Sequence, residues 1–275
     1  MDLDAYFARI GHHGPRDTSM RALAAIAHRH ALAIPFENID VLARGAPDLD
    51  ERAVEDKLVA RRRGGYCFEQ NHLLLAVLRR LGFAVDTFSA RVRFSVPAGM
   101  PMARTHMVLR VTTDEGPQLV DAGFGGFTLT APVRLATSEP QATSHETVRV
   151  VADAGVTVLQ VFTPPDWRDV YAFDFVPQLP IDYVQQNWYT ATKPGGLFTG
   201  NLVVAMPVER GRRTLFNRTF KERTIAGGEE RTAIDSIDTL RAILDSKFGL
   251  RIDEPELLAA WDASGRGLTS HPMLS

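Results

Sequence analysis

The spacing of apolar residues changes along this chain, from a helical period in the first third to a period of two in the middle. Met20, Leu23 and Ala27 recur at intervals of three and four, and the pattern ends before Pro35. This spacing is typical of an amphipathic helix, which a proline terminates. Asp50 precedes a second such pattern and is a good N-cap. We therefore expect residues 1–85 to form a helical bundle.

From about residue 86, apolar residues alternate with polar ones. Phe88, Ala90 and Val92 lie at every second position, which indicates a half-buried strand. Similar short runs follow, and turn-rich pieces such as the sequence PPDWRD separate them; the runs are 146–151, 156–162 and 169–173. Several short strands in succession favour a sheet or a small barrel over residues 86–190.

The last part, residues 191–275, mixes both periods. Strand-like runs cover 201–206, 213–217 and 218–225. Ile237, Leu240, Leu244 and Phe248 then repeat at helical spacing, and Gly249 is the expected C-cap. The whole chain is therefore predicted to have an α+β fold in three parts.

The chain contains one cysteine, Cys67, at the point where a glycine loop meets a predicted helix. A helix start stabilises an anion, and the thiolate is the nucleophilic form of cysteine. We expect Gly64 and Gly65 to permit a sharp backbone approach and to leave room for a reacting group above the sulfur. The alternative is a small buried apolar residue without a chemical role. If Cys67 is a nucleophile, its pKa should lie below the ~8.5 of a free cysteine, with a thiolate–imidazolium pair at rest.

The candidate base and its orienting group lie on two short predicted strands. If Asp114 and Glu115 form the turn between these strands, His106 faces Gly123, and Asp121 lies two residues along on the same face. Such diagonal neighbours are roughly 7–8 Å apart at Cα, and a slip of one residue would separate them. A carboxylate there orients an imidazole toward a thiol, as in a catalytic triad. The alternatives are a surface histidine and a turn aspartate.

Four segments resemble the arylamine N-acetyltransferase family: RGGYCFEQN at 63–71, RTHMVLRV at 104–111, DAGFGG at 121–126 and PFENID at 35–40. The resemblance covers essentially the whole chain. It implies a helical bundle, a β-barrel and an α/β lid around a Cys-His-Asp core like that of cysteine proteases. It also implies acetyl transfer from acetyl-CoA to arylamines, arylhydrazines or arylhydroxylamines, through an acetyl-cysteine formed in a ping-pong reaction.

The same resemblance assigns roles to individual residues. Cys67, His106 and Asp121 would be catalytic. Substrate-binding residues would be Phe36, Val96, Phe124 and Phe198, although the segment around Phe198 departs from the family's serine-containing pattern. Residues for the co-substrate would be Thr105, Gly125 and Gly126. Asn71, one helical turn after Cys67, would support the site or be an exposed helix residue.

Composition bounds the partners. The net charge is −2, so nothing favours nucleic acid, and no apolar run approaches the ~20 residues of a membrane span. The histidines lack zinc-site spacing, and no metal is expected. A single cysteine and an N-terminus without a leader favour the cytoplasm. The oligomeric state stays open, with a homodimer among the options.

Other interpretations remain open. Arg61–Arg63 would be a solvated helix end. Four histidines would be surface or helix-face residues: His12, His13, His28 and His30. With the same triad, an amide synthase would close a macrolactam from a polyketide-derived thioester, and a thiol hydrolase or transglutaminase-like enzyme would transfer the acyl group to water or lysine. A non-catalytic binding protein is the remaining class.

Overall fold

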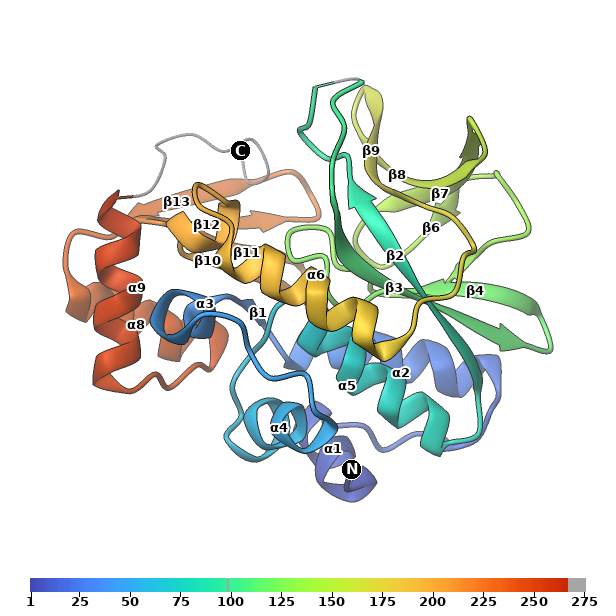
Figure 1. Ribbon diagram of the computed structural model, residues 1–275, viewed down its shortest axis with the longest axis horizontal. Helices are drawn as coiled ribbons and strands as arrows, with labels where there is room; N and C mark the ends of the chain where they lie inside the picture. Colours follow the sequence, from blue (N-terminus) through green and yellow to red (C-terminus); the bar gives the residue numbers. More distant parts are fainter. Residues whose placement is uncertain (98, 267–275) are drawn as a thin grey trace.

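A computed structural model describes residues 1–97 and 99–266 (Figure 1). Helices from the N-terminal third lie at the bottom of Figure 1, a curved sheet lies at upper right, and a second sheet with two helices lies at left. The predicted α+β class and its bundle, barrel and α/β lid are confirmed. Among the described residues, no helix has the length and apolar character needed to cross a membrane.

Six helical segments precede the first large sheet: α1 (Leu3–Ile10), α2 (Met20–Ala33), α3 (Ile39–Arg44), α4 (Glu51–Glu55), the π-helical turn η1 (Asp56–Ala60) and α5 (Cys67–Arg80). The predicted boundaries follow from their caps. The Ser19 hydroxyl accepts a hydrogen bond from Ala22 N at 3.2 Å, and α2 ends before Pro35. Asp50 caps α4 by accepting from Arg52 N at 2.9 Å.

The larger sheet has eight strands in the order β5-β4-β3-β2-β9-β8-β7-β6, and it curves into a nearly closed barrel. Its strands are β2 (Ala84–Val92), β3 (Arg104–Thr113), β4 (Gly116–Val120), β5 (Val133–Arg134), β6 (Gln141–Ala142), β7 (Thr147–Asp153), β8 (Val156–Thr163) and β9 (Asp166–Phe173). Strand β9 begins at Asp166, so most of the segment expected as a turn is strand. The core inside it joins Phe88 of β2 with Val150 of β7 and Tyr171 of β9.

The second sheet joins the two ends of the chain. Its order is β1-β10-β11-β12-β13, and β1 (Phe36–Glu37) pairs antiparallel with β10 (Val203–Val208). The other strands are β11 (Gly211–Phe216), β12 (Thr219–Thr224) and β13 (Glu229–Ala233), and helices α8 (Ile237–Phe248) and α9 (Glu254–Arg266) pack beside them. Gly249 ends α8 with a φ of 66°, as predicted.

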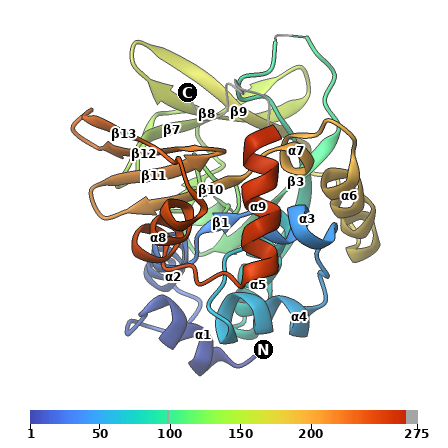
Figure 2. The same ribbon diagram turned by 90° about the vertical axis from the view of Figure 1, so that its left-hand side faces the viewer.

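Two helices connect the sheets, α6 (Pro180–Thr192) and the short α7 (Leu197–Gly200). The sequence analysis did not predict α6, α7 or α9. Helix α6 crosses the front of the molecule in Figure 1 and lies at its outer edge in Figure 2. Tyr183 and Ala191 of α6 share a core with the N-terminal helices. The three-part division at residues 85 and 190 stays a prediction. Residues 267–275, at the end of the predicted third part, lie outside the described part of the chain.

Candidate active site

Cys67 is the first residue of α5, and its side chain is 3 % exposed. The backbone N–H groups of Cys67 and Phe68 point toward the sulfur. The glycines before the helix allow the close backbone approach that the sequence predicts. A Cβ on Gly64 would lie 2.2 Å from Pro35 O, and a Cβ on Gly65 would lie 2.9 Å from the Glu69 side chain. Both glycines therefore permit close packing of the loop.

His106 and Asp121 meet as the predicted hairpin requires. Leu109 pairs with Val120, and Thr113 pairs with Gly116 across the turn, which is the register expected from the sequence. His106 Nε2 lies 2.7 Å from Asp121 Oδ2, and both side chains are buried. Because a carboxylate accepts, Nε2 carries the proton, and Nδ1 is left free as a base.

Asn71 fixes the carboxylate from the other side. Its Nδ2 donates to Asp121 Oδ1 at 2.9 Å, and its Oδ1 accepts from Ala122 N at 3.0 Å. Gly123 N also donates to Asp121 Oδ1, at 2.8 Å. Burial alone would raise the pKa of the Asp121 carboxyl, but His106 and these donors hold it below its usual range. Asn71 is fully buried, so its interpretation as an exposed helix residue is wrong.

Gly123, in the glycine-rich segment DAGFGG, packs directly against the nucleophile helix. A Cβ at this position would lie 2.7 Å from Cys67 Cα and 2.8 Å from the Asn71 amide nitrogen. The loop after β4 therefore touches the first turn of α5 directly. The repeated glycines of DAGFGG are the sequence signal for such a close approach.

The pKa predicted for the nucleophile is wrong in direction. Burial raises the pKa of the Cys67 thiol, and the negative charge of Asp121 raises it further, whereas the N–H groups of Phe68 and Cys67 lower it. The thiol donates a weak hydrogen bond to Thr105 O at 3.6 Å. Loss of water around the sulfur outweighs the helix start, because desolvation disfavours the charged form.

A cavity of about 420 Å³ opens beside Cys67 and His106. Five of the predicted substrate and co-substrate residues line it: Phe36, Val96, Thr105, Phe124 and Phe198. The structure does not place Gly125 or Gly126 on its wall. Gly125 instead packs against the Phe36 ring, with a φ of 77°, and its N–H donates to Thr128 Oγ1 at 2.8 Å.

Aromatic rings surround this cavity and the base. The Phe198 ring lies 5.7 Å from Phe36 and 6.0 Å from Tyr66, between ring centroids. His106 lies 5.3 Å from Phe124 and 5.0 Å from Tyr171. Tyr171, on β9, is a contact of the base that the sequence analysis missed. Its position depends on pairing between strands far apart in the chain.

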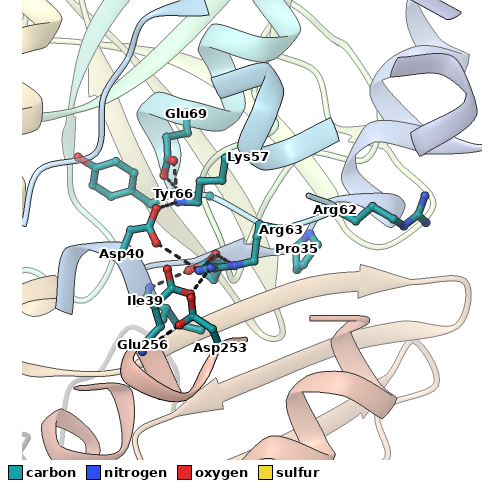
Figure 3. Close-up of polar contacts among 12 residues, drawn as sticks. Pro35, Ile39, Asp40, Lys57, Arg62, Arg63, Tyr66, Glu69, Asp253 and Glu256 are labelled. Atoms are coloured by element: carbon teal, nitrogen blue, oxygen red, sulfur yellow. Dashed lines mark hydrogen bonds and ion pairs between the residues drawn. The ribbon is translucent and has the colours of Figure 1, made fainter. Parts of the chain in front are cut away.

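A cluster of buried charges holds the loop that leads to Cys67 (Figure 3). Arg63 donates to Glu37 Oε1 at 2.8 Å and to Glu256 Oε2 at 2.5 Å. Glu37 belongs to β1 and Glu256 to α9. The Arg63 guanidinium therefore joins the loop before Cys67 to both of these elements. Arg63 is 4 % exposed, and its interpretation as part of a solvated helix end is wrong. Figure 3 shows Arg62 pointing away from the cluster.

The cluster continues to α5 itself. Lys57 Nζ lies 2.8 Å from Asp40 Oδ2 and 2.7 Å from Glu69 Oε1. Glu69 Oε2 accepts from Tyr66 N at 3.1 Å, next to the nucleophile. Burial raises the pKa of Glu69 to about 6, and Lys57 partly opposes it. The ion pairs therefore position the first turn of α5.

His30 supports the same loop through neutral hydrogen bonds. Gln70 donates to Pro35 O at 2.9 Å, so its Oε1 accepts from His30 Nε2 at 2.8 Å. His30 Nδ1 then accepts from Tyr6 Oη at 2.9 Å. Burial lowers the pKa of His30 to about 4. His12 and His30 are buried, so their predicted surface positions are wrong, whereas His13 is exposed and His28 is half-buried.

Most of the chain is similar to proteins of known family and structure. A family model described as N-acetyltransferase matches residues 19–257. An arylamine N-acetyltransferase of Escherichia coli strain K12 is 38 % identical over 253 residues, which cover 92 % of this chain and 90 % of the relative. An arylamine N-acetyltransferase / N-hydroxyarylamine O-acetyltransferase of Salmonella typhimurium is 36 % identical over the same shares.

Solved structures agree with these relatives. The Mycobacterium marinum arylamine N-acetyltransferase in complex with CoA superposes with a TM-score of 0.91 at 34 % identity, covering 97 % of this chain and 100 % of that one. The arylamine N-acetyltransferase of Mycobacterium tuberculosis superposes with a TM-score of 0.90 at 36 % identity, covering 96 % and 99 %. In the described residues, no group of three or more His, Cys, Asp or Glu side chains is arranged to hold a metal ion.

Proposed function

This chain belongs to the arylamine N-acetyltransferase family, and we propose that it transfers an acetyl group from acetyl-CoA to the nitrogen of an aromatic amine. One observation carries the proposal: Cys67 and His106 open onto one cavity, and His106 is held by Asp121 at 2.7 Å. The amide-synthase and hydrolase alternatives are not favoured by the relatives, whose names specify acetyl transfer to arylamines.

In the first half-reaction, His106 Nδ1 takes the proton of the Cys67 thiol. The sulfur attacks the thioester carbonyl of acetyl-CoA, and the N–H groups of Cys67 and Phe68 stabilise the developing oxyanion. The carbon–sulfur bond to CoA breaks, and His106 returns the proton to the departing CoA sulfur. The product is an acetyl-cysteine. This half-reaction depends on the base, because the thiolate is the nucleophile and His106 borders the same cavity as the thiol.

In the second half-reaction, the amine nitrogen attacks the acetyl-cysteine carbonyl. His106 takes a proton from the nitrogen and gives it to the Cys67 sulfur as the thioester breaks. The rings of Phe36, Phe124 and Phe198 bind the flat acceptor in edge-to-face or offset contact. The same cavity accepts arylhydrazines and arylhydroxylamines, which present a comparable nucleophilic nitrogen or oxygen on an aromatic ring.

The surroundings that we propose follow from charge and cysteine content. A net charge of −2 offers no general attraction for nucleic acid. The one thiol is buried and reacts with substrate, which suits the reducing cytoplasm. The predicted co-substrate contacts of Gly125 and Gly126 are proposed only for parts of CoA beyond the thioester, since neither residue lines the cavity.

A panel of aromatic amines, hydrazines and hydroxylamines, assayed with acetyl-CoA, tests this function. We expect CoA release that requires the acceptor and yields the acetylated acceptor. CoA release at the same rate without any acceptor would identify a hydrolase. No release with any member of the panel would remove the transferase proposal.

A further inference from the structure

Asn38 lies between β1 and α3, at a position where an asparagine side chain usually caps the helix that follows. Within the described part of the chain its side chain makes no such bond, and the neighbouring Glu37 carboxylate accepts from Ile39 N at 2.7 Å. Asn38 is only 1 % exposed, and its amide instead reaches the segment that contains α7, 160 residues later. This buried amide therefore has a role other than that of a helix cap.

Each polar atom of the Asn38 side chain has a backbone partner in that later segment. Its Nδ2 donates to Phe198 O and to Asn201 O, both at 2.8 Å. Its Oδ1 accepts from Val203 N at 2.8 Å. Moving α7 away would leave buried polar groups unpaired, which is costly. The amide thus fixes the position of α7 and of the chain that leads from it into β10.

Two further asparagines extend the contact into the second sheet. Asn201 Nδ2 donates to Leu197 O at 2.9 Å, and Asn201 Oδ1 accepts from Asn217 Nδ2 at 2.9 Å. Asn217 lies in the turn between β11 and β12, and its Oδ1 accepts from Leu202 N at 2.9 Å. All three asparagines are buried. We call these three residues, Asn38, Asn201 and Asn217, the amide network.

Helix α7 depends on contacts with other elements for its position. It has four residues, which are all half-buried, and a helix of this length is not stable alone. It contacts α3, α6 and α9, and Figure 2 shows it between α6 and α9. The hydrogen bond from Thr199 Oγ1 to Lys193 O, at 2.8 Å, is local. The amide network, in contrast, joins the backbone of α7 to β1 and to the second sheet.

The side chain of α7 that reaches the cavity is Phe198. Its ring lies 5.7 Å from that of Phe36, between centroids, so a flat acceptor lies against this pair of rings and not between them. Phe36 itself stands two residues before Asn38. We propose that Asn38 is a positioning residue for the acceptor, which rests on the proposed transfer to arylamines: it holds α7 so that Phe198 stays in the cavity wall, and it thereby determines which aromatic acceptors fit.

The kinetics of the two half-reactions test this role. In Asn38→Ala, we expect kcat/KM for aniline, a single-ring acceptor, to fall by roughly three- to tenfold, mainly through KM, which is the worth of one aromatic contact. The loss for 1-naphthylamine should be smaller, because a freed wall leaves more space for a second ring. The single-turnover rate of Cys67 acetylation by acetyl-CoA should stay at the parent value, since the proposed wall binds the acceptor.

Gln160→Ala is the matched control for these rates. Its amide also joins separate segments, because Gln160 Nε2 of β8 donates to Asp169 Oδ1 of β9 at 2.7 Å, but it does not line the cavity. We expect parent kinetics with both acceptors in Q160A. An unchanged kcat/KM for aniline in N38A would overturn the proposal, and so would equal losses in both half-reactions.

A double-mutant cycle separates a positioning role from a general packing defect. If Asn38 acts through the Phe198 ring, Phe198→Ala alone lowers kcat/KM for aniline. Adding Asn38→Ala to that variant should then lower it no further. Losses that add in the double variant would overturn the proposal, because they would show that Asn38 supports the fold without acting through Phe198.

Hydrogen exchange of the backbone amides of residues 197–203 measures the hold on α7 itself. We expect faster exchange there in N38A and parent exchange in Q160A. If circular dichroism shows that N38A is unfolded, Asn201→Ala takes its place, since it removes the bond to Leu197 O and should give the same changes. Parent exchange in the folded variant would overturn the proposal. A parent chain that acetylates no acceptor would instead remove the proposed function, whereas exchange would still show whether Asn38 holds α7.

Discussion

At the scale of single residues, the site depends on one carboxylate that determines which imidazole nitrogen is free. Asp121→Asn replaces an acceptor by an amide that can donate to His106, so the tautomer with a free Nδ1 is lost. We expect the steady-state rate of acetyl transfer to fall by roughly 10³–10⁴-fold with an unchanged melting temperature, by analogy with the serine triad. A variant within a few-fold of the parent would show that Asp121 serves only the turn.

Gly123 gives a second test at this scale, because its neighbours are the backbone and first turn of the nucleophile helix. In Gly123→Ala the new methyl group would lie 2.7 Å from Cys67 Cα. We expect a loss of about 1–3 kcal/mol in the free energy of unfolding and a lower rate of Cys67 acetylation. Gly200→Ala is the control, since a Cβ there meets nothing within 4 Å. Equal urea midpoints for the two variants would refute the close approach.

The lowered pKa of buried His30 should make the stability of the fold depend on pH. Its pKa is about 4 in the folded chain and near the ordinary 6.5 when unfolded, so the unfolded state binds more protons between these values. The free energy of unfolding should therefore fall as pH decreases from 6.5 toward 4, by up to ~3 kcal/mol from this group. Urea unfolding at several pH values, in the parent and in His30→Gln, isolates the effect. Identical slopes in this window would contradict it.

The sequence predicted some of these residues and not others, for a physical reason. Cys67, His106, Asp121 and Asn71 lie in short segments whose local pattern sets their geometry. The buried state of Arg63 could not be predicted locally, because one of its partners, Glu256, is 193 residues away. The thiol pKa was mispredicted for a similar reason, since the helix start is visible in the sequence and the burial is not.

At the scale of elements, the hairpin of β3 and β4 was predictable because a two-residue turn fixes its register. Helix α6 was not, since its protein-facing side is partly polar and its outer side is apolar. Helix α9 and β13 were also missed. Helix α9 packs on α3, far earlier in the chain, and the charge cluster of Arg63 joins it to α5. Strand β13 pairs with the neighbouring β12, but all of its residues are exposed, so it lacks the apolar alternation of a half-buried strand.

The buried charge cluster around Arg63 is predicted to hold β1, α9 and the loop before Cys67 together. Arg63→Met leaves Glu37, Asp40 and Glu256 without their shared buried cation, and should cost about 3–5 kcal/mol in the free energy of unfolding. Arg61→Met removes an exposed pair with Asp56 and should cost less than about 1 kcal/mol. Chemical denaturation of both variants gives the comparison. Similar small losses would mean that the cluster does not hold β1, α9 and the Cys67 loop together.

At the scale of the whole molecule, three regions contribute to one cavity. Cys67 comes from the N-terminal helices, His106 from the barrel and Phe198 from α7 near the second sheet. The α+β class and the order of the regions were predictable from the change of apolar period along the sequence. The way in which these regions come together around one cavity was not predictable. It depends on β1, which joins the second sheet by pairing with β10, more than 160 residues later.

The central claim is that Cys67 carries the acetyl group between the two substrates. Intact-protein mass spectrometry after acetyl-CoA alone tests it most directly, with Cys67→Ala as the matched control. We expect a gain of one acetyl group at Cys67 in the parent, none in C67A, and loss of that group as an acetylated arylamine forms on adding the acceptor. An acetyl group on any other residue, or transfer to the arylamine by C67A, would contradict the account.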